Sequence, residues 1–294
     1  MQENFGDKRH FRCFTLFLPD FLKQTMKYLI ILFSLFILKS ETTPVTFREK
    51  QKNYTRVREA YCNKEKCVLK TLAEHSISRD SLQIYLQAFK TEKKIEVWGK
   101  NKCDSAYTMI KEIPICEISG GIGPKRRSQD LQAPEGFYRI CELNPYSKYY
   151  LSMKINYPNA SDSIRGNRGH LGNLIYIHGS CESSGCLAIT DERIKELYVY
   201  CIEAYNSGQK EINITIYPTR LDDTTYTRLT SRYSKNKDYI SLWADLKKNY
   251  DFFNRTKRPA AIKFLPDGTH EISSSPKTTP QICSGDTSPV AIQQ

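Results

Sequence analysis

The sequence has no apolar segment long enough to cross a membrane. Its main apolar run, Tyr28–Leu38, contains 11 residues, whereas a membrane-spanning helix needs about 20. Lys27 precedes this run and the small residue Ser40 follows it, which is the pattern of a secretory signal peptide. The sequence therefore predicts an exported protein, with a leader over residues 1–40 and a natural start at Met26.

The sequence also lacks a cysteine shortly after the apolar run, so a bacterial lipoprotein anchor is not expected. Retention of the leader as an uncleaved membrane anchor stays open, because Leu38 and Lys39 form a poor context for cleavage.

A nucleic-acid signature is missing as well. The net charge of +12 suits a polyanionic partner, but the chain has no basic segment interleaved with aromatic residues and no nucleic-acid-binding motif. No nucleic acid is expected as a partner. An anionic cell envelope fits the charge better, and a basic surface that only favours solubility is the alternative.

No internal repeat is evident, and 39% hydrophobic with 26% charged residues is typical of one globular domain with flanking pieces. Apolar and polar residues alternate in segments bounded by turn residues, which predicts a mainly β fold. Strands are predicted at 82–89, 95–98, 107–118, 136–141, 149–155, 175–178 and 211–217, and a small hairpin at 262–264 and 269–272.

Helical spacing predicts one or two packed helices. The first follows Thr190, which can act as its cap, and the second spans Tyr239–Phe253. A solvated helix is expected around 54–60. The polar segment 222–238 is predicted to be a loop or connector.

The segment 177–187 is the most informative part of the chain. The β-rich run before it ends at His178, and Ser183 and Gly185 flank a tight turn that returns Cys186 towards the imidazole. A nearby imidazole lowers the pKa of a thiol and can carry its proton. Backbone N–H groups of Gly185 and Cys186 are candidate donors to an oxyanion. The pattern predicts cysteine acyl transfer.

These residues carry a resemblance to a known family. A His-Gly pair, a short interval and Ser-x-Gly-Cys resemble the signature of the L,D-transpeptidase catalytic-domain family, which acts on the stem peptides of bacterial peptidoglycan. Residues 80–220 resemble its murein-peptidase branch firmly, and 243–264 more loosely. The further matching motifs are Gly120–Lys125, Ala133–Tyr138, Leu143–Pro145, Ser147–Ser152, Tyr157–Asn159, Asp162 and Ala188–Asp191.

The resemblance implies an L,D-transpeptidase-type β-sandwich and a role for each site residue. Cys186 would be the nucleophile, His178 the proton donor and acceptor, and the Gly179 carbonyl the group that orients the imidazole. No metal or organic cofactor is implied. Ser183, expected to hydrogen-bond within the turn, is also a candidate substrate-proximal residue, together with Tyr138, Tyr157 and Asn159.

Two departures from the wider family concern the direction of the reaction. Ser184 stands where many members have histidine, and Ala188 replaces an arginine. The murein-peptidase branch shares the second change, so hydrolysis of L,D bonds is expected, with transpeptidation as the alternative.

The resemblance also sets the predicted organisation and location. The segments are a leader over 1–40, a polar helical lead-in over 41–80, the catalytic domain over 81–218, a helix and hairpin extension over 219–272 and a disordered tail over 273–294. The expected location is the bacterial cell envelope, on its periplasmic or cell-wall side. Peptidoglycan stem peptides, and an envelope protein linked to peptidoglycan, are the expected partners.

Ten cysteines are many for an exported protein. Without Cys13 in the leader and the proposed nucleophile, eight remain, an even number that permits disulfides without defining their pairing. Buried free thiols are the alternative. Cys181 is interpreted as a small filler of the loop, with a redox pair to Cys186 as the other possibility.

Four other interpretations are weaker. An inactive peptidoglycan-binding relative is disfavoured by the intact His178–Cys186 pair. A zinc site formed by these two residues with Cys181 and Cys201 has an uncommon ligand spacing, and the local sequence of a papain-like protease is missing. Finally, contact between acidic substrate groups and the basic residues at 125–127 is less expected than a solvated basic loop.

Overall fold

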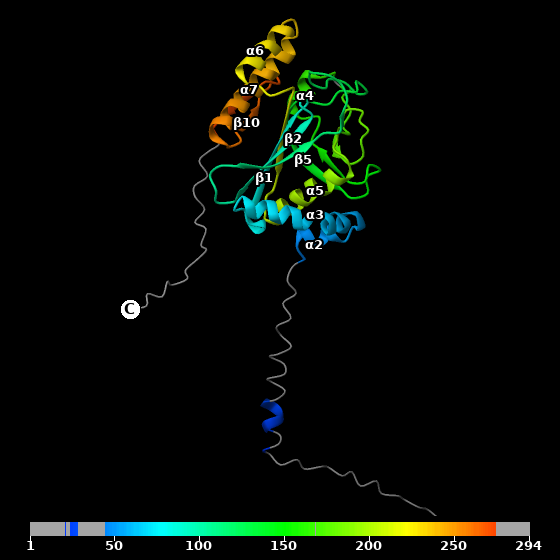
Figure 1. Ribbon diagram of the computed structural model, residues 1–294, viewed down its shortest axis with the longest axis vertical. Coiled ribbons are helices and arrows are strands. Elements are labelled where there is room, and N and C mark those ends of the chain that lie inside the picture. Colours follow the sequence, from blue (N-terminus) through cyan, green and yellow to red (C-terminus); the bar gives the residue numbers. More distant parts are fainter. Residues whose placement is uncertain (1–20, 22–23, 29–44, 168, 275–294) are drawn as a thin grey trace, which may run out of the picture. The chain divides into compact units, whose positions relative to one another are not determined.

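The computed structural model describes residues 21, 24–28, 45–167 and 169–274 (Figure 1). The chain from Thr46 onward forms one compact unit. Residues 29–44 and 275–294, which hold most of the predicted leader's apolar run and most of the predicted tail, lie outside this description. Among the described residues, no helix has the length and apolarity needed to cross a membrane.

A curled nine-stranded sheet forms the centre of the unit, with strand order β3-β2-β1-β9-β5-β6-β7-β8-β4 (Figure 1). Most neighbours are antiparallel, but β1 with β9 and β7 with β8 are parallel. The strands are β1 Leu82–Phe89, β2 Lys94–Asn101, β3 Thr108–Pro114, β4 Glu117–Ile118, β5 Gly136–Asn144, β6 Ser152–Ile155, β7 Tyr176–His178, β8 Leu187–Ala188 and β9 Ile212–Tyr217. The prediction of a mainly β fold is confirmed.

Helices α2 (Phe47–Lys52), α3 (Thr55–Glu74) and α5 (Asp191–Asn206) cover one face of the sheet (Figure 1). The expectation of a solvated lead-in helix is wrong, because α3 packs on α5 and buries one apolar stripe. The buried residues of α3 are Val57, Ala60, Tyr61, Val68 and Leu72.

A buried carboxylate ties this layer together. Glu203 of α5 accepts hydrogen bonds from Arg48 of α2, from Arg79 and from the Tyr61 hydroxyl. Its side chain is fully buried, while those of Arg48 and Arg79 are 19% and 25% exposed. Burial acts to raise the pKa of Glu203, but the two arginines outweigh it and hold this pKa below its ordinary value.

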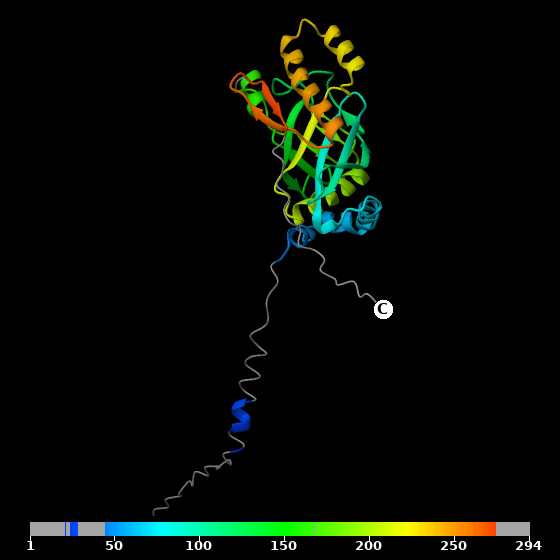
Figure 2. The same cartoon turned by 90° about the vertical axis from the view of Figure 1, so that its left-hand side faces the viewer.

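The C-terminal extension covers part of the other face. It consists of α6 (Asp223–Arg232), α7 (Lys237–Thr256) and the hairpin β10 (Ala261–Phe264) with β11 (His270–Ser273), which lies against α7 (Figure 2). A second apolar cluster forms here, with Trp243 and Leu246 fully buried. The predicted helix and hairpin are confirmed.

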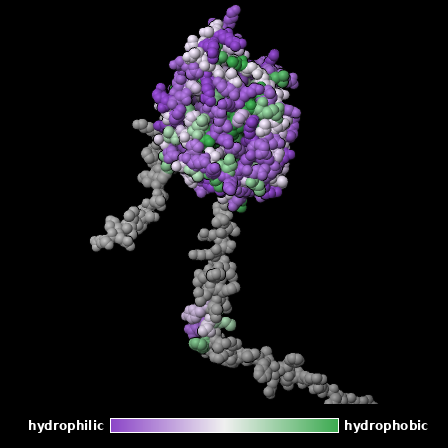
Figure 3. Space-filling view, viewed as in Figure 1, coloured by the Kyte–Doolittle hydropathy of each residue, from purple (hydrophilic) through white to green (hydrophobic). Residues whose placement is uncertain are grey.

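The prediction of a loop over 222–238 is wrong, because α6 occupies its first half. Asp222 caps this helix by accepting a hydrogen bond from the Thr225 N–H. Only Leu229 of α6 is buried, so the sequence shows almost no apolar periodicity there. In the view of Figure 3, hydrophilic residues dominate the surface of the unit.

Candidate active site

The parallel pair β7–β8 sets the arrangement of the predicted histidine and cysteine. Its register places His178 opposite Ala188 and Ile177 opposite Leu187, so Cys186 continues the register opposite Tyr176. Side chains two residues apart on a strand point to the same face. His178 and Cys186 therefore lie on one face of adjacent strands, offset by two residues, or roughly 6.6 Å along the strand.

The imidazole of His178 is fixed in one orientation. Its Nδ1 lies 2.6 Å from the Gly179 carbonyl oxygen, the contact that the family resemblance implies. A carbonyl only accepts, so Nδ1 carries the proton and the neutral ring presents Nε2 as a base. The ring stacks on Tyr149, with centroids 4.4 Å apart. Burial lowers the pKa of His178 and favours this neutral form.

Gly179 leaves no room for a side chain. A Cβ atom there would stand 2.6 Å from the Tyr149 carbonyl oxygen and would also collide with Asp191. Asp191 instead accepts a hydrogen bond from the Ser180 N–H at 2.7 Å, which joins the start of α5 to the histidine loop. Thr190 occupies the N-cap position of α5, as predicted, but its side chain makes no capping hydrogen bond.

The turn before the thiol requires glycine. Gly185 has a φ of +112°, which side chains other than hydrogen rarely tolerate. The expected hydrogen bond within the turn is present, since the Ser183 hydroxyl donates to the Cys186 carbonyl at 2.8 Å. This bond and the glycine conformation fix the path of the backbone that supplies the candidate oxyanion donors.

The thiol of Cys186 is partly buried and donates to the Leu174 carbonyl at 3.6 Å. The expectation that its pKa is lowered is not met: burial raises this pKa, although the Tyr176 backbone N–H and the Lys125 cation act in the opposite direction. Both shifts favour the uncharged forms, a protonated thiol and a neutral imidazole.

A disulfide next to the site corrects the interpretation of Cys181. Cys181 is bonded to Cys116, with Cα atoms 5.5 Å apart, so it is neither a filler nor a redox partner of Cys186. A disulfide sulfur supplies no thiolate to a metal, which removes one ligand of the zinc alternative. Among the described residues no group of His, Cys, Asp or Glu could hold a metal ion.

Three of the four residues predicted to lie near substrate are buried in an internal hydrogen-bond network. The Tyr138 hydroxyl donates to Asp162 at 2.9 Å. Asn159 caps α4 (Ala160–Arg165) by accepting from the Asp162 N–H at 2.8 Å, and the Tyr157 hydroxyl lies 3.5 Å from the Lys125 and Leu171 carbonyl oxygens. Burial raises the pKa of Asp162 to about 6. Substrate contact by Tyr138, Tyr157 and Asn159 stays a prediction.

The interpretation of 125–127 as a solvated basic loop is wrong for its first two residues. The Lys125 side chain is only 6% exposed and is paired with Asp130, and Arg126 is paired with Asp238 of α7. Each cation is compensated by a carboxylate: Asp130 lies in the same loop as Lys125, and Asp238 is 112 positions from Arg126 in the sequence.

Sequence reasoning missed two neighbours of the reacting groups. Tyr149 supports the imidazole, and its presence in the matched motif 147–152 was the available signal. Lys125 acts electrostatically on the thiol from a loop 61 positions earlier, and no local pattern indicates this.

Fold and site geometry agree with the L,D-transpeptidase-type domain that the sequence resembles. The family model of the L,D-transpeptidase catalytic domain, YkuD, matches residues 84–206. The Escherichia coli (strain K12) protein named "Putative L,D-transpeptidase YafK" is 35% identical over 213 residues, which are 71% of this chain and 82% of that protein. The chain therefore belongs to the L,D-transpeptidase family.

Two solved structures are also similar. The helical cell shape determining protein Pgp2 from Campylobacter jejuni is 19% identical, with a TM-score of 0.39 over 67% of this chain and 80% of that one. Bd1075 of Bdellovibrio bacteriovorus is 21% identical, with a TM-score of 0.35 over 61% and 63% of the two chains.

Proposed function

We propose that this protein is a cysteine-dependent enzyme that cleaves L,D bonds in the stem peptides of peptidoglycan and transfers the acyl group to an amine or to water. One observation carries the proposal: the β7–β8 pairing brings His178, at the end of β7, beside the strand that Cys186 directly precedes, while the Gly179 carbonyl leaves Nε2 of the imidazole as the base. Membership of the family supports the substrate class.

The chemistry starts from neutral groups. Nε2 of His178 takes the proton of the Cys186 thiol, and the sulfur attacks the carbonyl carbon of the L-centre. The C–N bond to the D-residue breaks, the imidazolium returns its proton to the leaving amine, and a thioester remains. A second amine or water then attacks the thioester, and His178 removes the proton of the attacking group. The C–S bond breaks, and the imidazolium returns this proton to the sulfur of Cys186, which restores the neutral pair.

The tetrahedral intermediate needs donors for its oxyanion. The backbone N–H groups of Gly185 and Cys186 are the candidates, because the positive φ of Gly185 turns the chain immediately before the nucleophile. A Cβ at position 185 would lie 3.2 Å from the Gln132 carbonyl oxygen. Gly185→Ala is therefore expected to disturb catalysis through backbone geometry alone.

Hydrolysis is the direction we favour, alongside transfer. Ala188 is fully buried on β8, opposite His178, where a typical synthetic member carries arginine. The short interval between His178 and Cys186 leaves little protein to cover a thioester, so water competes with an acceptor amine. New cross-links without any hydrolysed product would contradict this preference.

The site of action is proposed to be the periplasmic or cell-wall side of the bacterial envelope. The support is the charged and apolar pattern of residues 27–40. A chain that starts at Met26 is expected to reach the envelope, and deletion of Tyr28–Leu38 to retain the protein in the cytoplasm. Cytoplasmic retention of the Met26 chain would show that residues 1–25 belong to the leader.

The test of activity is mass spectrometry of defined muropeptides after incubation with the purified chain. The substrates are cross-linked, protein-linked and free tetrapeptide muropeptides, and the masses of their products distinguish hydrolysis from transfer. Cys186→Ala should lose both reactions, whereas Cys62→Ala, which removes an exposed free thiol on α3, should retain them. Binding of peptidoglycan without any product would favour the inactive relative.

A further inference from the structure

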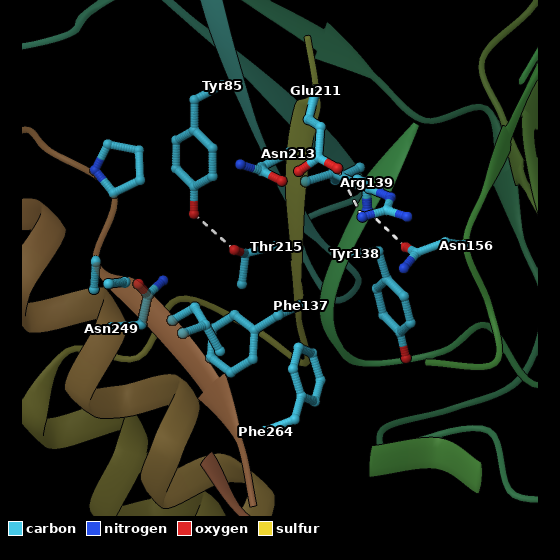
Figure 4. Close-up of a pocket in the computed structure, with 15 residues that line it drawn as sticks. Tyr85, Phe137, Tyr138, Arg139, Asn156, Glu211, Asn213, Thr215, Asn249 and Phe264 are labelled. Carbon is cyan, nitrogen blue, oxygen red and sulfur yellow. Dashed lines mark hydrogen bonds and ion pairs between the residues drawn. The ribbon is translucent and has the colours of Figure 1, made fainter. Parts of the chain in front are cut away.

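A polar cleft lies over the central strands of the sheet, on the face opposite α3 and α5. We call it the sheet-face cleft; its cavity volume is about 390 Å³, within the range of roughly 300–1,000 Å³ that is usual for small-molecule sites. Strands β1, β9 and β5 form its floor, and α7 with residues 259–264 forms its wall (Figure 4).

The register of the three strands explains the lining. Phe137 pairs with Thr215 and Arg139 with Asn213 across β5 and β9, and the parallel pairing of β1 with β9 continues this row to Tyr85. Paired residues on neighbouring strands share a face. All five side chains therefore point into the same cleft, as Figure 4 shows for the labelled residues.

The cleft favours an uncharged ligand. Among the described residues that line it, only Arg139 and Glu211 carry charge. They form an ion pair at 2.7 Å in which each side chain is about half exposed, so each charge is already compensated. A ligand with a free carboxylate or ammonium group would have to compete with this pair.

Two amides can supply hydrogen bonds to such a ligand. Asn213 is exposed on the floor, and Asn156 accepts from the backbone N–H of Arg139 at 2.7 Å, whereas Asn249 is buried and donates to the Tyr217 hydroxyl. An amide has two donor hydrogens and an acceptor oxygen, so one internal bond leaves further capacity. Groups that both donate and accept match the hydroxyl and acetamido groups of sugars.

Aromatic rings supply the apolar surface. Phe137 and Phe264 line the cleft and are each held edge-on against the buried His270 ring at 4.9 Å. Their orientation is fixed by this packing, and aromatic faces bind the C–H faces of sugar rings. An extended peptide would instead be expected at a sheet edge, where backbone groups are unpaired, and the cleft lies over interior strands.

We propose that the sheet-face cleft binds the glycan strand of peptidoglycan, an uncharged N-acetylated oligosaccharide. This inference rests on the proposed function for the biological source of the sugar. Asn156 of the cleft directly precedes Tyr157, whose hydroxyl lies by the Lys125 loop next to the thiol. One short segment thus connects the cleft to the catalytic loops, so glycan held in the cleft would leave attached stem peptides close to the thiol.

The test measures sugar binding apart from catalysis. The probes are a linear N-acetylglucosamine tetramer and hexamer, which carry no carboxylate, titrated calorimetrically into the purified chain. The variant Asn213→Lys places bulk and charge in the cleft from an exposed position, and Phe264→Ala removes one aromatic wall. Each should weaken binding at least tenfold, while Asn254→Ala, at an exposed asparagine of α7 outside the cleft lining, should bind as the unaltered chain does.

The outcomes separate this inference from the proposed function. Cys186→Ala should bind the sugar probes with unaltered affinity, because the thiol is not part of the cleft. If the chain binds the sugar probes through Asn213 but does not turn over stem peptides, the result would support sugar binding by the cleft and contradict the proposed function. The glycan assignment would be overturned if the chain bound no sugar probe, or if Asn213→Lys bound the probes with unaltered affinity. It would also be overturned if the cleft bound a free stem peptide in a way that depends on Asn213.

Discussion

Cys116 is joined by a disulfide to Cys181, which lies inside the short loop between the candidate base and nucleophile. Cys116 stands immediately before β4, and its N–H donates to the Ala188 carbonyl at 2.7 Å. Strand β4 in turn pairs with β8. The crosslink therefore ties the outer edge of the sheet to the catalytic loop, on the side away from β7.

Removal of this disulfide is expected to affect both stability and turnover. The double variant Cys116→Ser with Cys181→Ser should lose about 2–4 kcal/mol in the free energy of unfolding, measured by urea denaturation. Turnover should fall because the loop carrying the thiol loses its tether. Cys62→Ser is the matched control for loss of a thiol. If the double variant were as stable and as active as the unaltered chain, the disulfide would have no role in stability or turnover.

The pH dependence follows from the two shifted groups. Burial raises the pKa of Cys186 and lowers that of His178, so near pH 7 the thiol is protonated and the imidazole is neutral. Turnover should rise with pH below about 6.5 as His178 loses its proton, and then level off. Alkylation of Cys186 by iodoacetamide should keep accelerating above about pH 8.5; a rate already at its plateau at pH 7 would indicate a preformed thiolate.

Lys125 is expected to tune the thiol. Its cation acts to lower the pKa of Cys186, so Lys125→Met should raise this pKa further and slow alkylation at a fixed neutral pH. Lys263→Met, at an exposed position of β10, should leave the alkylation profile as it is. An unchanged profile in Lys125→Met, with circular dichroism showing the native fold, would remove Lys125 from the electrostatics of the site.

Glu203 should be one of the costliest charges to remove. Glu203→Gln leaves two arginine side chains without their buried partner, and we expect a loss of about 3 kcal/mol. Glu271→Gln, which breaks an exposed pair with Lys263, should cost less than about 1 kcal/mol. Thermal or urea unfolding of the two variants measures the difference, and equal losses would contradict the account.

The sign of the pH effect on stability provides a second check on Glu203. Its pKa is lower in the folded than in the unfolded state, so its contribution is fully present above the unfolded value of about 4.3. That contribution is lost as the pH falls through the folded pKa. The stability difference between Glu203→Gln and the unaltered chain should therefore shrink towards low pH.

Local patterns in the sequence predicted the elements that have strong periodicity. The β1–β2 hairpin, strand β7 and helices α5 and α7 alternate or repeat their apolar residues clearly. Helix α3 also carries a readable stripe, with Val57, Tyr61, Val68 and Leu72 at helical spacing, although its polar and basic composition suggested a solvated surface. Helix α6 buries a single residue, so only its Asp222 cap indicated a helix.

The features that escaped prediction depend on tertiary contacts. Cys116 and Cys181 lie 65 positions apart, and their pairing follows from the contact of β4 with β8, which cysteine spacing does not encode. The raised pKa of Cys186 follows from burial, whereas the sequence suggested only a nearby histidine. Thr190 holds the expected N-cap position but makes no capping hydrogen bond, and Asp191 instead reaches back to accept from the Ser180 N–H.

The most direct test of the account is the intact mass of the protein after brief incubation with a tetrapeptide stem and acid quenching. The account predicts a population heavier by the acyl portion of the peptide, with the added mass mapped to Cys186. This adduct should be absent in Cys186→Ala and retained in Cys62→Ala. Product formation by Cys186→Ala, or an acyl group mapped to another residue, would contradict the thioester mechanism.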